Sequence, residues 1–139
     1  MLDPGITWLP AHASGAALRI EAEFRPHPAG EVGLILRSGG AERTLLAYDA
    51  ASGELRLDRT ASGDTGFHPD FPSVQTAAVR LEDGLLRLRV YVDSCSVEVF
   101  AQDGLVSITD QIFPGEASTA VGIFAGGDGG TLMGLDVVR

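Results

Sequence analysis

The alternation of apolar and polar residues between Leu86 and Ala101 restricts the fold more than any other feature of the chain. Its apolar members are Leu86, Leu88, Val90, Val92, Val97, Val99 and Ala101. A period of two is typical of a β-strand with one buried and one solvated face. A reversal around Ser94-Cys95 pairs Val92 with Val97 and Val90 with Val99, which turns both valine pairs toward the core. The same register predicts a polar outer face, on which Tyr91 lies opposite Glu98.

Asp103-Gly104 indicates a tight turn after the second of these strands. Both central residues of a type I′ turn need a positive φ, which Asp-Gly adopts readily. The turn returns the chain into Leu105, Val106 and Ile108. The three strands together predict a meander.

The rest of the sequence predicts an all-β fold. The 139 residues include 18 glycines and 7 prolines, which separate many short apolar runs, and this pattern favours a sandwich or barrel over helices. About ten strands are expected, near residues 17–25, 32–38, 43–49, 54–59, 74–82, 85–93, 96–102, 105–113, 119–125 and 131–138. We therefore expect a two-sheet antiparallel β-sandwich, jelly-roll or concanavalin-like, over residues 15–139. Residues 1–14 are expected to be a linker or lead-in segment.

Charge and hydropathy argue against several classes of partner. The formal net charge of −9 disfavours nucleic acid, because phosphates require clustered Lys and Arg side chains. No apolar run approaches the roughly 18 residues of a transmembrane helix, and no signal-peptide pattern is visible, so no membrane partner is expected. The single cysteine, Cys95, allows no internal disulfide. An uncharged ligand suits this chain better.

Two residues leave alternatives open. Trp8 either caps one end of the sandwich or offers a flat platform for a sugar ring. Asp110 interrupts the apolar series of Val106, Ile108 and Ile112, which indicates either a β-bulge or a metal-bound carboxylate. No oxygen-ligand loop motif indicates a structural calcium ion, and no cofactor is expected.

The run from Val92 to Gly104, followed by the segment from Thr109 to Pro114, carries a family resemblance. Its sequence Val-Asp-Ser-Cys-Ser-Val-Glu-Val-Phe-Ala-Gln-Asp-Gly resembles the C-terminal β-sandwich of the family 32 glycoside hydrolases, the invertases, levanases and inulinases. It is also similar to the family 66 carbohydrate-binding modules, which bind levan. Further segments agree in the same order, namely Leu18–Phe24, Gly33–Arg37, Tyr48–Ala50, Leu55–Arg59 and Ser62–Gly63. The resemblance implies the same sandwich over residues 15–139.

Asp93 and Glu98 raise the question of catalysis, because two carboxylates can act as general acid and as nucleophile or base in a glycosidase. They lie around one tight hairpin on an exposed face, where nothing desolvates either of them as a general acid requires. In the resembling hydrolases the catalytic carboxylates lie in an N-terminal five-bladed propeller, marked by Asn-Asp-Pro, Arg-Asp-Pro and Glu-Cys motifs. None of these motifs occurs here, so the chain is not expected to be an enzyme.

Sugar binding uses the same residue types differently. A sugar hydroxyl both donates and accepts hydrogen bonds, so a binding face needs carboxylate acceptors and the donor fork of arginine. The candidate substrate-binding residues combine these types with two strand tyrosines and a histidine from the long loop over residues 60–73: Arg37, Tyr48, Arg59, His68, Tyr91, Asp93 and Glu98. Structural alternatives remain, namely a solvated cross-strand cluster for Glu98, a turn with a local ion pair for Asp58-Arg59, and a backbone hydrogen bond for His68.

These observations predict a non-catalytic module that recognises the fructose units of a levan-type β-fructan through polar contacts. The alternative is the C-terminal support domain of a β-fructosidase, with little sugar affinity and an N-terminal β-propeller as its partner. The resemblance further implies an extracellular protein whose ligand is a fructan polysaccharide or a fructose oligosaccharide. The two hypotheses differ in whether the outer surface is concave and polar or carries a flat apolar patch.

Overall fold

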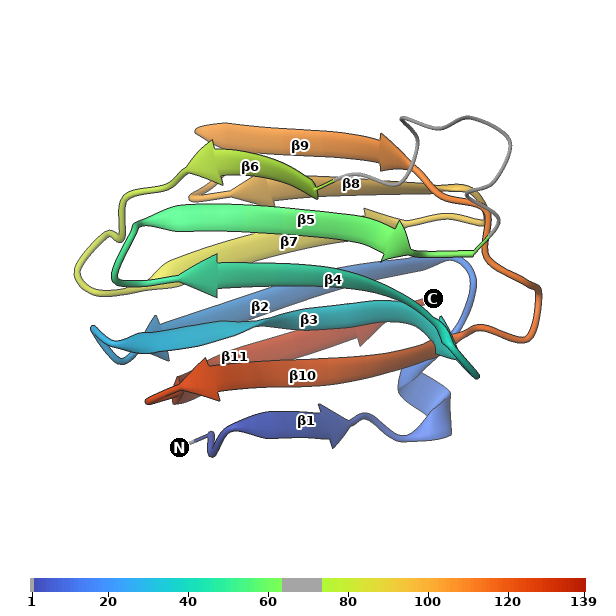
Figure 1. Ribbon diagram of the computed structural model, residues 1–139, viewed down its shortest axis with the longest axis horizontal. Helices are drawn as coiled ribbons and strands as arrows, with labels where there is room; N and C mark the ends of the chain where they lie inside the picture. Colours follow the sequence, from blue (N-terminus) through green and yellow to red (C-terminus); the bar gives the residue numbers. More distant parts are fainter. Residues whose placement is uncertain (1, 64–73) are drawn as a thin grey trace.

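Two antiparallel sheets pack face to face in this protein (Figure 1). The computed structural model describes residues 2–63 and 74–139. The six-stranded sheet has the order β1 (Gly5–Trp8), β10 (Ala120–Gly127), β3 (Gly30–Gly39), β4 (Glu42–Asp49), β5 (Glu54–Ala61) and β6 (Val74–Ala78). The five-stranded sheet has the order β11 (Gly130–Val138), β2 (Leu18–Pro26), β7 (Leu86–Val92), β8 (Ser96–Ala101) and β9 (Val106–Gln111). The predicted all-β, two-sheet sandwich is confirmed.

Helical structure in residues 2–63 and 74–139 is limited to one 3₁₀ turn, η1 (Ala11–Ala13). No helix of these residues is long and apolar enough to cross a membrane.

The β7–β8 hairpin has the register predicted from the sequence. Val92 pairs with Val97 and Val90 with Val99, and all four side chains are buried in the core. On the other face of the hairpin Tyr91 lies opposite Glu98. The apolar residues of this segment therefore face the core, and the residues between them face the solvent.

The turn between β8 and β9 begins one residue earlier than the Asp-Gly signal predicts. Gln102 and Asp103 have φ angles of 53° and 57°, and the Gly104 amide donates to the Ala101 carbonyl at 3.2 Å. The Gln102 side chain is buried, where its Nε2 donates to the carbonyls of Arg80 and Leu85 and its Oε1 accepts from the Arg87 amide. These bonds offset the strain of a positive φ at a residue that is not glycine.

The core lies between the sheets and receives every second residue of the long strands. Leu34 and Leu46 of the six-stranded sheet and Phe24 and Leu86 of the five-stranded sheet are fully buried there. Tyr48 also belongs to this layer, and its hydroxyl donates to the Val79 carbonyl at 2.8 Å. The hydroxyl is thus satisfied inside the molecule.

Residues 5–8, expected in an irregular segment, form the edge strand β1. The strand pairs with β10 through backbone hydrogen bonds, with Ile6 opposite Phe124 and Trp8 opposite Gly122. A Cβ atom on Gly122 would lie 2.9 Å from Ile6 Cγ2 and 3.0 Å from Trp8 Cε3. The side chains of β1 therefore fold over this glycine, and Trp8 covers the outer face of β10 instead of capping an end of the sandwich.

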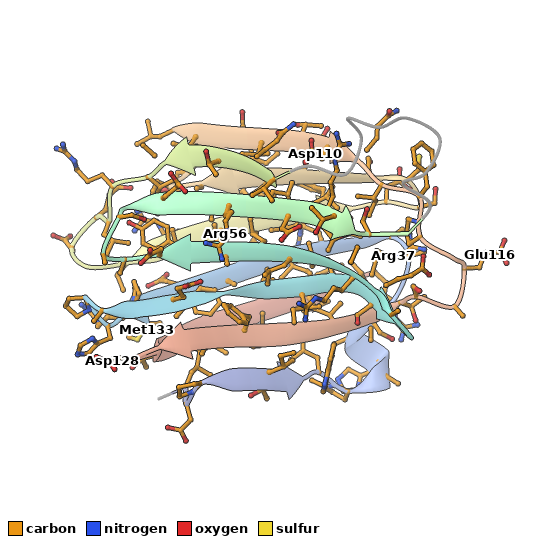
Figure 2. The ribbon with its side chains drawn as sticks, in the orientation of Figure 1. Arg37, Arg56, Asp110, Glu116, Asp128 and Met133 are labelled. Carbon is orange, nitrogen blue, oxygen red and sulfur yellow. The ribbon has the colours of Figure 1, made fainter. Side chains whose placement is uncertain are left out.

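Arg37 ties the two sheets together at one end of the molecule (Figure 2). The residue is only 2% exposed. Its Nε donates to the Ser118 carbonyl at 2.6 Å and its Nη2 to the Gly115 carbonyl at 3.2 Å, both before β10. Its Nη1 donates to the carbonyls of Asp93 and Ser94 in the β7–β8 turn, at 3.2 Å and 2.9 Å. One guanidinium thus satisfies carbonyls from two separate connections.

Replacing Arg37 tests this cross-link. We expect Arg37→Met to lower the free energy of unfolding by about 3 kcal/mol, because it removes several hydrogen bonds from a charged donor and leaves partly buried carbonyls without partners. Urea denaturation measures the change. Arg43→Met, which alters an exposed arginine of β4, should change stability by no more than about 0.5 kcal/mol. Equal effects of the two substitutions would rule out the proposed cross-link.

Candidate functional site

The outer face of the five-stranded sheet carries charged and aromatic side chains in ordered rows. Alternation along β2, β7, β8 and β11 turns these side chains away from the core. Strand pairing aligns them as Val138–Arg19–Tyr91–Glu98, Asp136–Glu21–Arg89–Phe100 and Gly134–Glu23–Arg87. We refer to the surface formed by these rows as the polar groove.

Two shallow depressions make up the polar groove. The larger has a volume of about 550 Å³ and lies over Glu21, Glu23, Arg89 and Glu98. The smaller, of about 340 Å³, lies over Arg19, Asp93 and Val138. Tyr91 lines both depressions, so they meet at this side chain.

Two ion pairs and one aromatic contact lie among the residues that line the larger depression. Arg89 Nε lies 3.3 Å from Glu21 Oε1, and Arg87 Nη2 lies 3.3 Å from Asp103 Oδ2. The rings of Tyr91 and Phe100 meet edge to face, with centroids 6.0 Å apart. Donors and acceptors therefore alternate around an aromatic wall, which is the arrangement that a polyhydroxy ligand requires.

Three predicted site residues come together in the polar groove. Tyr91 and Glu98 line the larger depression, and Tyr91 and Asp93 line the smaller one. Tyr91 is 40% exposed, and the residues Asp93 and Glu98 are also exposed. The carboxylate of Asp93 additionally accepts the Ser94 amide at 2.7 Å, which fixes its position at the end of the hairpin.

The other predicted site residues lie elsewhere. Tyr48 is in the core and Arg37 is buried at the end of β3, and each is 2% exposed. Burial lowers the pKa of the Arg37 guanidinium, and the nearby carboxylates of Glu42 and Asp93 act in the opposite direction. His68 falls outside the described residues. Arg59 lies beside Asp110, with its Nε 3.9 Å from the carboxylate.

Arg59 of β5 and Asp110 of β9 form an ion pair between the two sheets, with 13% of the Arg59 side chain and 3% of the Asp110 side chain exposed. Arg59 Nε lies 3.9 Å from Asp110 Oδ2, and Arg59 Nη1 donates to the Gln111 carbonyl at 2.9 Å. Asp110 pairs with Val97 without a register shift, so the predicted bulge does not form there. Within the described ranges Asp110 Oδ2 has no hydrogen-bond partner, and no group of three potential ligands that could hold a metal ion is found. Burial raises the pKa of Asp110, and the charge of Arg59 partly opposes this shift.

Sequence reasoning did not find the charged residues of β2 and β11 that line the polar groove. Glu21 and Glu23 alternate with buried Ile20, Ala22 and Phe24, so their outward direction was readable from the sequence. Their place beside Arg89 and Arg87 was not, because it depends on the long-range pairing of β2 with β7. Asp136 joins them through the pairing of β11 with β2.

The outer face of the six-stranded sheet has the opposite character. Its outward residues align as Trp8–Gly122–Ile35–Leu45 and Ile6–Phe124–Gly33–Ala47, and we refer to these eight residues as the apolar face. Ile35 and Ala47 lie outside the core cluster, yet they are 0% and 1% exposed. Charged side chains flank the apolar face: Glu31 of β3 pairs with Arg56 of β5 at 3.2 Å (Arg56 is labelled in Figure 2).

Residues 4–138 match the family model described as the C-terminal domain of the family 32 glycosyl hydrolases. A levanase from Bacillus sp. strain L7 is 39% identical over 127 residues, which are 89% of this chain and 14% of that protein. A levanase from Bacillus subtilis strain 168 is 37% identical over 130 residues, which are 91% of this chain and 19% of that protein. The chain therefore spans less than a fifth of the length of either relative.

Solved structures show the same architecture. The exo-inulinase from Aspergillus awamori superposes with a TM-score of 0.79 at 29% identity, over 96% of this chain and 25% of that one. A family 66 carbohydrate-binding module from Bacillus subtilis superposes with a TM-score of 0.71 over 99% of this chain and 84% of that one. The second pair is 14% identical, so that likeness concerns the fold alone.

The raised pKa of Asp110 predicts a pH-dependent contribution to stability. The folded state holds a proton on this carboxyl above the ordinary aspartate pKa of about 3.9, so its stability falls as the pH rises through the window between that value and the raised pKa. We expect Asp110→Asn to change the unfolding free energy little at acidic pH and to raise it by about 1 kcal/mol at neutral pH, because the substitution removes a poorly compensated buried charge. Urea denaturation of both proteins over a pH series measures the difference. A difference independent of pH would disprove the assignment.

Proposed function

Because this chain belongs to the C-terminal domain family of the family 32 glycosyl hydrolases, we propose that it binds levan-type β-fructan through the polar groove. The family match occupies residues 4–138, so the catalytic domain is absent from this chain. The role of the domain is to attach the protein that carries it to the polysaccharide. Holding an enzyme or a cell surface against a fructan raises the local concentration of substrate without any new chemistry.

The polar groove is the observation that carries this proposal. Its carboxylates and arginines supply hydrogen-bond acceptors and donors side by side, and Tyr91 with Phe100 supplies an apolar wall. Uncharged sugars need this mixture, because every hydroxyl that leaves water must find a new partner. Glu98 is exposed in the groove, which suits an acceptor for sugar hydroxyls better than a general acid.

The names of the relatives agree with a fructan as the ligand and with a place outside the cell. The two similar bacterial proteins are levanases. A protein of Aspergillus ficuum that is 37% identical over 108 residues is an extracellular exo-inulinase. We propose that this domain likewise works outside the cell, on a fructan polysaccharide or a fructose oligosaccharide.

Substitutions in the polar groove test the binding function. We expect Glu98→Ala and Tyr91→Ala each to weaken retention on levan about tenfold, which corresponds to about 1.4 kcal/mol, because each removes a side chain that faces the ligand. Affinity electrophoresis in gels containing levan, inulin or an unrelated glucan measures retention. Glu54→Ala, an exposed glutamate on the opposite sheet, is the matched control and should bind normally.

Two results would count against this placement. The wild-type domain could migrate freely through every fructan gel, which would end the binding proposal. Alternatively, Arg59→Ala could abolish retention while the groove variants bind normally. The site would then lie at the Arg59 end of the sandwich, where the sequence also predicted a contact.

The apolar face supports a second function, the support of a catalytic domain. It presents Trp8, Ile6 and Leu45 on a sheet face, and Trp8 and Ile6 are 50% and 39% exposed. A contiguous apolar surface of this kind is typical of a protein–protein contact. The relatives are several times longer than this chain. We propose that the apolar face of this domain packs against a catalytic β-propeller domain.

Association in trans tests the support function. The partner is the Bacillus subtilis levanase produced without the segment that matches this chain. We expect the wild-type domain to bind it in calorimetry, and Leu45→Lys to weaken binding at least about tenfold because it places a charge in an apolar contact. Glu98→Ala is the control and should bind like the wild type. Equal losses in both variants, or no association of the wild type, would refute this role for the apolar face.

A further inference from the structure

The two depressions of the polar groove form one continuous track along the strands. The larger extends from the row of Glu23 and Arg87 to the row of Tyr91 and Glu98. The smaller continues from Tyr91 to Asp93 at the end of β7. Successive rows on one face of a sheet are separated by two residues, so four rows span roughly 20 Å. That length exceeds a single monosaccharide.

We infer that the polar groove is an extended site that holds consecutive units of a fructan chain, with Tyr91 at the junction between two subsites. This inference rests on the proposed fructan binding and specifies its ligand as an oligosaccharide segment. The larger depression is the main subsite, and the smaller one is an extension that only longer ligands reach.

Tyr91 is suited to the junction by its position and its rigidity. Among the residues that the structure describes, Tyr91 is the one aromatic side chain that lines both depressions, and its ring lies edge to face against Phe100. A ring held in this way loses little conformational entropy when a ligand packs against it. Its phenol hydroxyl can donate to one sugar unit and accept from the next.

The extension has its own polar groups. Arg19 of β2 pairs with Tyr91 of β7 and is exposed. Within residues 2–63 and 74–139 its side chain has no hydrogen bond or ion pair. Asp93 contributes a carboxylate that is already fixed by its bond to the Ser94 amide. Both depressions are shallow, so a ligand gains affinity by covering more of the track instead of by deep burial in one pocket.

A ladder of fructo-oligosaccharides from the disaccharide upward tests the inference by calorimetry. We expect affinity to rise about tenfold from the shortest ligand to a plateau. Tyr91→Ala should weaken binding of every length. Arg19→Gln should weaken only the ligands long enough to reach the extension, and so remove most of the gain with length. Arg25→Gln, which alters an exposed arginine on the same strand outside both depressions, is the matched control and should retain the full gain.

The outcomes separate this inference from the binding function itself. Equal affinity for all lengths, or a length dependence that Arg19→Gln leaves intact, would overturn the extended site while fructan binding stands. The absence of binding at every length and on the polymer would remove the proposed function and the inference together.

Discussion

The apolar layer between the sheets accepts every second residue of the long strands, and this constraint determines what the outer faces can be. Packing Val90 and Val99 inward turns Tyr91 and Glu98 outward on the same hairpin. Where the outward residues are charged, as on β2 and β7, the face becomes a polar groove. Where they are aliphatic, aromatic or glycine, as in the middle of β3, β4 and β10, the face is apolar. One core thus creates two chemically different surfaces.

The two surfaces suit two kinds of contact, and a buried arginine links the two sheets that carry them. Side chains that donate and accept around an aromatic wall suit a polyhydroxy ligand, whereas an apolar sheet face suits another protein. Arg37 of β3, in the six-stranded sheet, donates a hydrogen bond to the carbonyl of Asp93. Asp93 lies at the far end of the polar groove. The shape of that end therefore depends on a hydrogen-bonded network at the edge of the core.

Local alternation made much of this structure predictable, and long-range contacts made the rest inaccessible. The period of two specified the β7–β8 register and the shared face of Tyr91 and Glu98. The same rule could have placed Tyr48 inside, because it has the parity of buried Leu46. The burial of Arg37 could not be foreseen, since a register shift after Leu36 and a φ of 47° turn its side chain inward. The position of Glu21 and Glu23 in the polar groove depends on the pairing of β2 with β7, which no local sequence pattern specifies.

Mapping amide chemical shifts by NMR during titration with levan-derived oligosaccharides tests the division between the two faces most directly. Fructan binding at the polar groove predicts that the shifts change along β2, β7 and β8, with the largest effects near Tyr91, and that β3, β4 and β10 remain unperturbed. Changes confined to the apolar face or to the Arg59 end of the sandwich would contradict it.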